Sequence, residues 1–292
     1  MPSEDAPPDA WPEILGITHL KNPDFLLLAE PFAPHTNQFL AGIDYAFPKS
    51  TKIGGLTSGG TQPGTNHLYL GHSVYTEGII GLAFEGDLVM KPIVAQGCRP
   101  IGDAKQITKC QGNLLIELDD ESPLAYLSKI YPTLPGRDQE LFRNQLLLGV
   151  GVNPVLYPDD QNTNEFLIRN IVGADPEKGI LAIGELIREG QIVQFHVRDA
   201  VSSAEDLRRQ LHRYLGDSTR PSQPQAAIMF ECTGRGSYLY GEEGHDSNLF
   251  AETIGSIPLT GFFCNGEIGP VGDTTFLHGY TASIAIFHSK TV

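Results

Sequence analysis

Apolar residues along this chain gather mainly in short runs bounded by Gly, Pro, Asn and Asp, a pattern typical of β-strands. These runs predict strands over 25–29, 79–84, 88–90, 93–96, 114–118, 146–152, 166–172, 180–183, 192–197, 226–230 and 284–287. The strands between 146 and 197 are separated by short Gly, Asn and Asp turns, so we expect them to form an antiparallel meander rather than a series of strand–helix–strand units.

A smaller number of segments have helical character, over 36–45, 123–131, 138–145, 204–215 and 247–254. Ser122 is a favourable N-cap, and Pro123 suits the first helical position. Ser202 or Ser203 is expected to cap the helix over 204–215, whose apolar residues lie on one face. Together the patterns predict a mixed α/β (α+β) protein with mostly antiparallel sheets flanked by helices.

Two distant segments follow the same order of elements. Each has an apolar strand, a polar connection, a helix, a turn, a glycine-rich loop and a closing apolar run. Gly54 to Gly59 (GGLTSG) aligns with Gly261 to Gly266 (GFFCNG), and Tyr75-Thr76 aligns with Tyr280-Thr281. We interpret this as an internal duplication that gives two pseudo-symmetric lobes, with a site between the copies.

Composition narrows the function classes. The 292 residues are 40% hydrophobic, enough for a substantial core. The net charge of −15 argues against nucleic-acid binding, because phosphate contacts require a Lys/Arg surface. No membrane-length apolar run or signal peptide is visible, and the four widely spaced cysteines fit reduced thiols in a cytoplasmic protein.

The first candidate site residue is Arg235, between Gly234 and Gly236 after the strand over 226–230. Successive glycines can turn backbone N–H groups toward an anion, and a guanidinium can hold a carboxylate through two hydrogen bonds. This arrangement suits an amino acid or another carboxylate ligand. A surface turn with a solvated arginine is the alternative.

The second candidate group comprises Cys264, Asn265, Glu267, His278 and Tyr280, which are expected at the same end of the lobe. A Cys near a His could be an activated nucleophile, a binding-pocket residue or a buried thiol. The aligned first copy has Thr57 in place of Cys264, which favours a pocket wall over catalysis. Thr57 and Ser58 would form the matching wall.

Other motifs are less specific. Arg99 could point into a cleft between lobes or close a strand-end turn, and Arg198-Asp199 is most simply an ion pair at a helix entry. The histidines and cysteines lack metal-binding spacings, and the loop over 54–60 lacks the Lys of a phosphate-binding loop. We therefore expect no metal and no cofactor.

Several motifs in consistent order carry a family resemblance: GGLTSGG, VAQGCRPIG, FHVRDAVSSAEDL, FECTGRGSYLYG and GFFCNGEIGPVG. Over roughly 11–287 the chain resembles the FIST proteins, an intracellular signal-transduction family that also occurs in some F-box proteins. The Pro-, Asp- and Glu-rich composition of the first residues predicts a disordered tail over 1–10. The resemblance implies the C-terminal part of a FIST N-type domain over 11–118 and a FIST C-type domain over 119–292. Typical members carry further sequence ahead of Trp11, so the chain resembles a fragment, a shortened homologue or a truncated gene model.

The family resemblance implies a sensory domain that binds a small ligand such as an amino acid in the cleft between lobes. A protein-interaction platform, as in the F-box members, is the alternative, and a Cys-dependent hydrolase or transferase is the third hypothesis. We expect a small-molecule or protein partner, and neither nucleic acid nor membrane.

Overall fold

The computed structural model describes residues 7–152, 166–221 and 223–290. The chain forms two compact units. The discontinuous unit combines residues 1–96 with 204–292, and the inserted unit comprises residues 97–203. Residues 1–6 of the expected tail lie outside the described residues, and the first helix, α1, already begins at Ala10.

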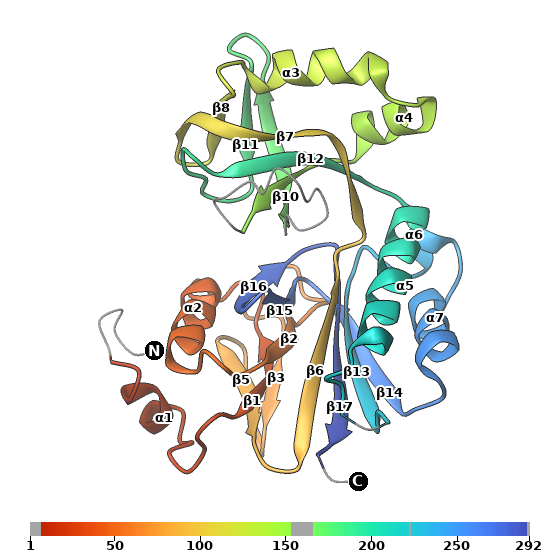
Figure 1. The fold of residues 1–292 in the computed structure, drawn as a ribbon. Coiled ribbons are helices and arrows are strands. Elements are labelled where there is room, and N and C mark those ends of the chain that lie inside the picture. Colours follow the sequence, from red (N-terminus) through yellow and green to blue (C-terminus); the bar gives the residue numbers. More distant parts are fainter. Residues whose placement is uncertain (1–6, 153–165, 222, 291–292) are drawn as a thin grey trace. The chain divides into compact units, whose positions relative to one another are not determined.

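Two sheets form the discontinuous unit (Figure 1). The first sheet has the order β16-β15-β2-β1-β5, and the second has the order β14-β13-β17-β6. The pairs β1–β2 and β13–β14 are parallel, and the other pairs are antiparallel. The strands are β1 (Asp24–Ala29), β2 (Lys52–Leu56), β5 (Ile79–Phe84), β6 (Leu88–Ala95), β13 (Ala226–Cys232), β14 (Leu259–Cys264), β15 (Glu267–Val271), β16 (Thr274–His278) and β17 (Ala282–Ser289).

Helices cover the outer faces of both sheets. Trp11 from α1 (Ala10–Ile14) and Leu40 from α2 (Thr36–Ala46) pack against Leu27 of the first sheet. On the second sheet, α5 (Ala200–Gly216) and α7 (His245–Ile254) pack against β13 and β17. A third cluster includes Ile53 and Phe230 from the two inner faces. The unit is therefore layered as helix, sheet, sheet and helix, which confirms the predicted fold class.

The two halves of this unit have matching registers. Leu27 lies opposite Gly54, and Met229 lies opposite Gly261. A Cβ atom on either glycine would approach the carbonyl oxygen of the opposite residue to 1.8 Å, so neither position has room for a side chain. The structure thus agrees with the sequence alignment of the two glycine loops.

The alignment of Tyr75-Thr76 with Tyr280-Thr281 needs correction. The amide of Glu30 donates to the carbonyl oxygen of Gly78, and the amide of Cys232 donates to that of Thr281, both at 2.9 Å. The structural counterpart of Thr281 is therefore Gly78, two positions beyond the expected residue.

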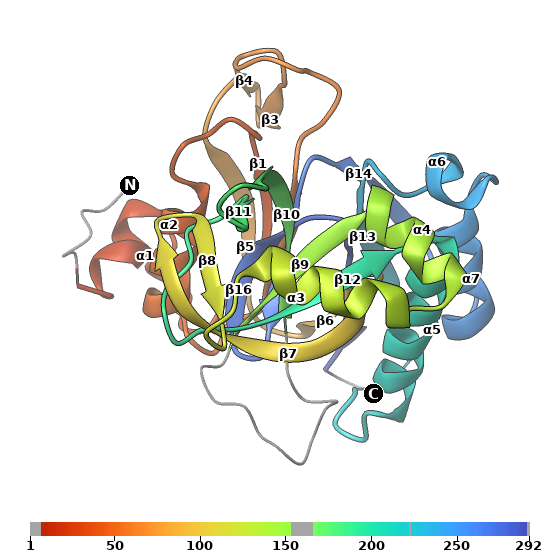
Figure 2. The same ribbon diagram turned by 90° about the horizontal axis from the view of Figure 1, so that it is seen from above.

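The two matching hairpins are used differently. In the second half, β15 extends the first sheet by pairing with β2, where Glu267 lies opposite Gly55. In the first half, β3 (Leu68–Leu70) and β4 (Ser73–Tyr75) form a separate two-stranded sheet, visible in Figure 2. The second sheet consequently ends at β14, whose outer edge is not covered by another strand of the described ranges.

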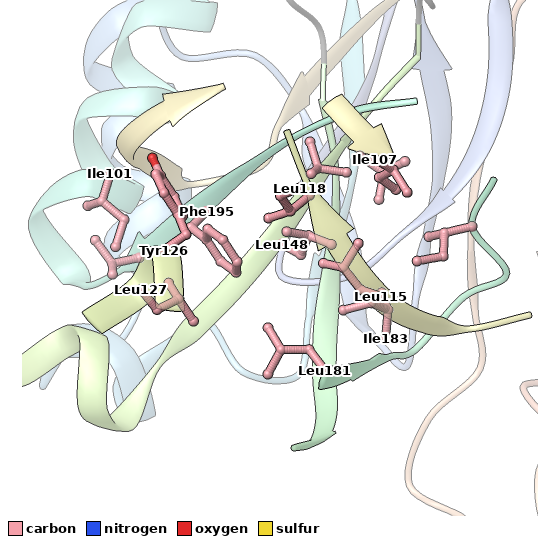
Figure 3. Packing of buried hydrophobic residues seen from close by; sticks show 14 residues of the cluster. Ile101, Ile107, Leu115, Leu118, Tyr126, Leu127, Leu148, Leu181, Ile183 and Phe195 are labelled. Carbon is pink, nitrogen blue, oxygen red and sulfur yellow. The ribbon is translucent and has the colours of Figure 1, made fainter. Parts of the chain in front are cut away.

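The inserted unit is a closed barrel of order β10-β11-β8-β7-β12-β9. Its core includes Leu115, Leu148 and Phe195 (Figure 3). Adjacent strands are antiparallel, and β9, β10 and β11 form a meander as predicted. The fourth strand of the expected meander, β12, pairs with β9 and β7 rather than with β11. The elements are β7 (Cys98–Gln111), β8 (Leu114–Leu118), α3 (Pro123–Ile130), η1 (Tyr131–Thr133), α4 (Gly136–Asn144), β9 (Leu146–Gly151), β10 (Phe166–Asp175), β11 (Ile180–Ile183) and β12 (Ile192–Arg198).

The predicted start of α5 was wrong. The helix begins at Ala200, and Asp199 rather than Ser202 or Ser203 caps it, because Asp199 Oδ1 accepts the amide of Ser202 at 2.7 Å. Asp199 also pairs with Arg137, rather than forming the expected ion pair with Arg198. In contrast, Ser122 caps α3 as expected, since its hydroxyl oxygen accepts the amide of Ala125 at 3.3 Å.

Candidate functional site

The candidate site lies where β13 ends and α7 begins. Between them, Arg235 precedes the short helix α6 (Ser237–Tyr240), which the sequence pattern did not predict. The Arg235 side chain is fully buried. Its Nε donates to Asp246 Oδ2 at 2.6 Å, its Nη2 donates to the Tyr240 hydroxyl at 2.7 Å, and its Nη1 donates to the Tyr280 carbonyl at 3.4 Å. Protein groups therefore occupy this guanidinium, which was expected to hold a carboxylate ligand.

Asp246 is the counter-ion of this arginine rather than a simple helix cap. It also lies 3.0 Å from His245 Nδ1. Burial raises the pKa of Asp246, but the positive charge and hydrogen bond of Arg235 outweigh burial and leave the pKa below its usual value. Arg235 and Asp246 therefore form a buried ion pair at the site, in which each charge neutralises the other.

Glu231, at the end of β13, is the residue that sequence reasoning missed. Burial, reinforced by the negative charge of Asp246, raises its pKa from 4.5 to about 8. Glu231 Oε1 is buried and accepts no hydrogen bond from the part of the chain that the structure describes. This oxygen therefore lacks the hydrogen-bond partner that buried polar atoms normally have.

Glu231 and Asp246 line a cavity of about 340 Å³. Phe262 and Phe263 of β14 form an apolar wall, and both are partly exposed. The carbonyl oxygens of Pro258 and Cys264 accept amides from β13 and from the residue directly after it, so the even-numbered residues of β14 face β13. Because backbone groups alternate in direction along a strand, Gly261 turns its N–H and C=O away from β13, toward the open edge. The cavity therefore combines a buried acceptor, aromatic surface and outward-facing backbone.

Cys264 lies in the packing between the two sheets. It is fully buried, and its thiol donates to the Phe262 carbonyl oxygen at 3.5 Å. Burial, with a smaller contribution from Glu267, raises the pKa of Cys264 far above its usual value. A Cβ atom on Gly55 would lie 2.3 Å from Cys264 Sγ, so this glycine provides space for the thiol. These surroundings disfavour the thiolate that nucleophilic chemistry requires.

The neighbouring predicted residues mainly hold the strands together. Glu267 is buried and accepts the amide of Thr281 at 3.1 Å. His278 is buried with Nε2 at 3.0 Å from the Gly269 carbonyl oxygen. Asn265 is exposed. None of these three lines the 340 Å³ cavity, whereas Gly236 does.

The first-half residues also have structural contacts. Thr57 donates its amide and its hydroxyl to the Ala29 carbonyl oxygen, at 2.8 and 3.3 Å. The Ser58 hydroxyl donates to the Phe263 carbonyl oxygen on the edge of β14. Ser58 is thus adjacent to the aromatic wall of the cavity, although it comes from the other half of the unit.

Arg99 belongs to the inserted unit, where it forms a two-point ion pair with Asp138 at the start of α4. Arg99 lies at the start of β7, and Asp138 occupies its guanidinium. The described ranges contain no group of His, Cys, Asp and Glu residues arranged to hold a metal ion. None of the helices in those ranges combines the length and apolar character that a membrane-spanning segment requires.

Family models match two adjacent segments of the chain, the FIST N domain over residues 6–121 and the FIST C domain over residues 124–270. The chain belongs to the FIST family. FIST domains are sensory domains of signal transduction. The boundary between the two matched segments falls within the inserted unit, so the FIST N and FIST C segments do not coincide with the two compact units of this FIST protein.

Relatives include an uncharacterized protein of Mycobacterium tuberculosis, 37% identical over 262 residues that cover 90% of this chain and 67% of that protein. F-box only protein 22 of Homo sapiens is 33% identical over 84 residues, or 23% of this chain and 21% of that protein. An F-box/LRR-repeat protein of Arabidopsis thaliana is 29% identical over 108 residues, or 35% of this chain and 20% of that protein.

Proposed function

We propose that this FIST protein is an intracellular, cytoplasmic sensory domain that binds a small amine-bearing ligand, such as an amino acid, in the cavity beside Glu231. The observation that carries the proposal is that Glu231 lines the cavity while its buried Oε1 has no hydrogen-bond partner in the described ranges. An ammonium group supplies a donor and a positive charge next to two carboxyl groups. Recognition through the amine replaces the expected contact between Arg235 and a ligand carboxylate.

The surroundings fit a zwitterion of small size. The 340 Å³ cavity is within the range of small-ligand sites. The outward backbone groups near Gly261 offer N–H donors to a ligand carboxylate, and Phe262 and Phe263 offer apolar surface to its side chain. The internal Arg235–Asp246 pair stabilises the shape of the cavity without competing for the ligand.

Calorimetric titration with the common amino acids tests this proposal. At least one should bind the wild type, and Glu231→Gln should weaken it about tenfold to a hundredfold, the range for a hydrogen bond to a charged group. Glu243→Gln is the matched control, because Glu243 is exposed and lies outside the cavity. Absence of binding by every amino acid, or equal loss in both variants, would refute the assignment.

A protein-interaction platform is the second candidate, favoured by the exposed edge of β14. An extended peptide could add to this edge by backbone hydrogen bonding, with Phe262 and Phe263 beside it. F-box relatives make such a role relevant. Phe263→Pro would remove an outward-facing N–H of β14 and block edge pairing, so partner capture that survives this variant would count against the β14 edge.

We also infer that the matching halves arose by duplication. The shared registers and the equivalent close approaches at Gly54 and Gly261 support this inference. We propose a non-catalytic role for Cys264, in agreement with its burial and raised pKa. An activity that disappears in Cys264→Ser while the fold is retained would overturn that assignment.

A further inference from the structure

A second cavity, of about 850 Å³, lies in the first half of the discontinuous unit. Its walls come from α1, the connection between β1 and α2, and the segment around β4 and β5. Aromatic residues provide much of this surface, namely Trp11, Phe32, Phe39 and Tyr75. Phe32 and Tyr75 are 42% and 44% exposed, so part of this apolar lining faces solvent.

Glu30 is the acidic residue of this cavity, and it is only 2% exposed. Its Oε2 accepts the amide of Phe32 at 2.7 Å, and its Oε1 accepts Asn66 Nδ2 at 3.4 Å. No Lys, Arg or His in the described ranges forms an ion pair with Glu30. Burial of a carboxylate costs free energy unless a positive charge compensates it. The two donors to Glu30 are neutral, so a bound cation would supply the compensating charge.

The charge of the residues that line the cavity also favours a cation. Glu77 is a second acidic residue of the cavity, and the lining contains no Lys or Arg. His35 is its one residue with a basic side chain, and Nδ1 of that ring lies 2.7 Å from Gln38 Oε1. An anionic ligand would therefore meet negative charge here.

We propose that this cavity is a binding site for an organic cation with an apolar body. The ammonium group lies against the Glu30 carboxylate, and the body packs on the aromatic side chains, whose faces attract cations. A bare inorganic cation would leave most of 850 Å³ unfilled, whereas an aryl-alkyl amine matches both the charge and the apolar surface.

This site is independent of the proposed amino-acid site. Glu30 follows β1 of the first sheet, Glu231 lies in β13 of the second sheet, and the two residues line different cavities. Failure of one site therefore leaves the other testable, because each has its own carboxyl variant and its own ligand class.

Calorimetric titration at pH 7 with four related compounds tests the proposal. Phenethylamine and benzyltrimethylammonium carry a positive charge, 2-phenylethanol is neutral, and 3-phenylpropionate is negative. We expect both cations to bind about tenfold to a hundredfold more tightly than the alcohol, as for interactions with a charged group, and the carboxylate to bind most weakly. Equal affinity for phenethylamine and 2-phenylethanol would overturn the proposal.

Glu30→Gln should remove most of the preference for the cations and leave binding of the alcohol unchanged. Glu252→Gln is the matched control, because Glu252 is an exposed carboxylate of α7 that does not line this cavity, and its removal should leave the affinity of all four compounds unchanged. Should Glu30→Gln fail to fold, Tyr75→Ala at the partly exposed rim gives a second readout. That variant should weaken both cations several-fold, and unchanged cation affinity there would contradict the aromatic part of the site.

Discussion

The raised pKa of Glu231 makes the stability of this FIST protein depend on pH in a predictable direction. In the folded state Glu231 holds its proton up to a pH of about 8, whereas its ordinary pKa is 4.5. The folded chain therefore binds more protons than the unfolded chain between these values. The contribution of neutral Glu231 to the free energy of unfolding is therefore complete below pH 4.5, and it is lost as the pH rises through about 8.

The size of the effect follows from the pKa difference. Between pH 4.5 and about 8, each pH unit lowers the free energy of unfolding by about 1.4 kcal/mol, so the total loss is about 5 kcal/mol. Glu231→Gln removes the ionisation but keeps a side chain of similar shape. The variant should therefore gain stability relative to wild type by about this amount between pH 4.5 and 9.

Urea unfolding of both proteins across this pH range provides the measurement. Trp11 is the single tryptophan, and its burial against Phe39 makes its fluorescence a reporter of the discontinuous unit. Other titrating groups are common to both proteins, so the difference between the two curves isolates Glu231. Parallel curves would show that Glu231 ionises normally in the folded state and would refute the reasoning.

Three further predictions concern stability. Asp246→Asn should cost about 3–5 kcal/mol in urea unfolding, because it leaves Arg235 buried without its counter-ion; unchanged stability would contradict this role. Gly55→Ala should cost about 1–3 kcal/mol through overpacking. Adding Cys264→Ala should restore part of that loss, and strict additivity would argue against the contact. Asp199→Ala should cost about 1 kcal/mol by removing the cap of α5, and a change in thermal stability too small to resolve would count against it.

The sequence predicted the repeated elements well because they depend on local patterns. Apolar runs identified β1 and β13, and the glycines at 54 and 261 stand where the opposite strand leaves no room for a Cβ atom. The transfer of β15 onto β2 could not be predicted, because strand pairing across the unit depends on long-range packing.

The candidate site was predicted less completely. Arg235 was placed correctly after the strand that forms β13, but its partner Asp246 lies eleven residues away, and no local pattern pairs the two. Glu231 follows an apolar run, where the pattern indicates only a strand end. In the first half, Glu30 likewise follows an apolar run, directly after β1, and it was not predicted as a site residue. An acidic residue closing a buried strand was the available signal in both cases.

The central place of β17 in the second sheet has a consequence for biosynthesis. β17 lies between β13 and β6, although β6 is made much earlier in the chain. The inserted unit is a continuous segment that ends at Ser203, so it can fold on the ribosome before β17, the pairing partner of β6, has been synthesised. A nascent chain that stops before Ala282 contains the whole FIST C match yet leaves β6 and β13 without the strand that joins them. Translation must therefore pass β17 before the second sheet of the discontinuous unit can close.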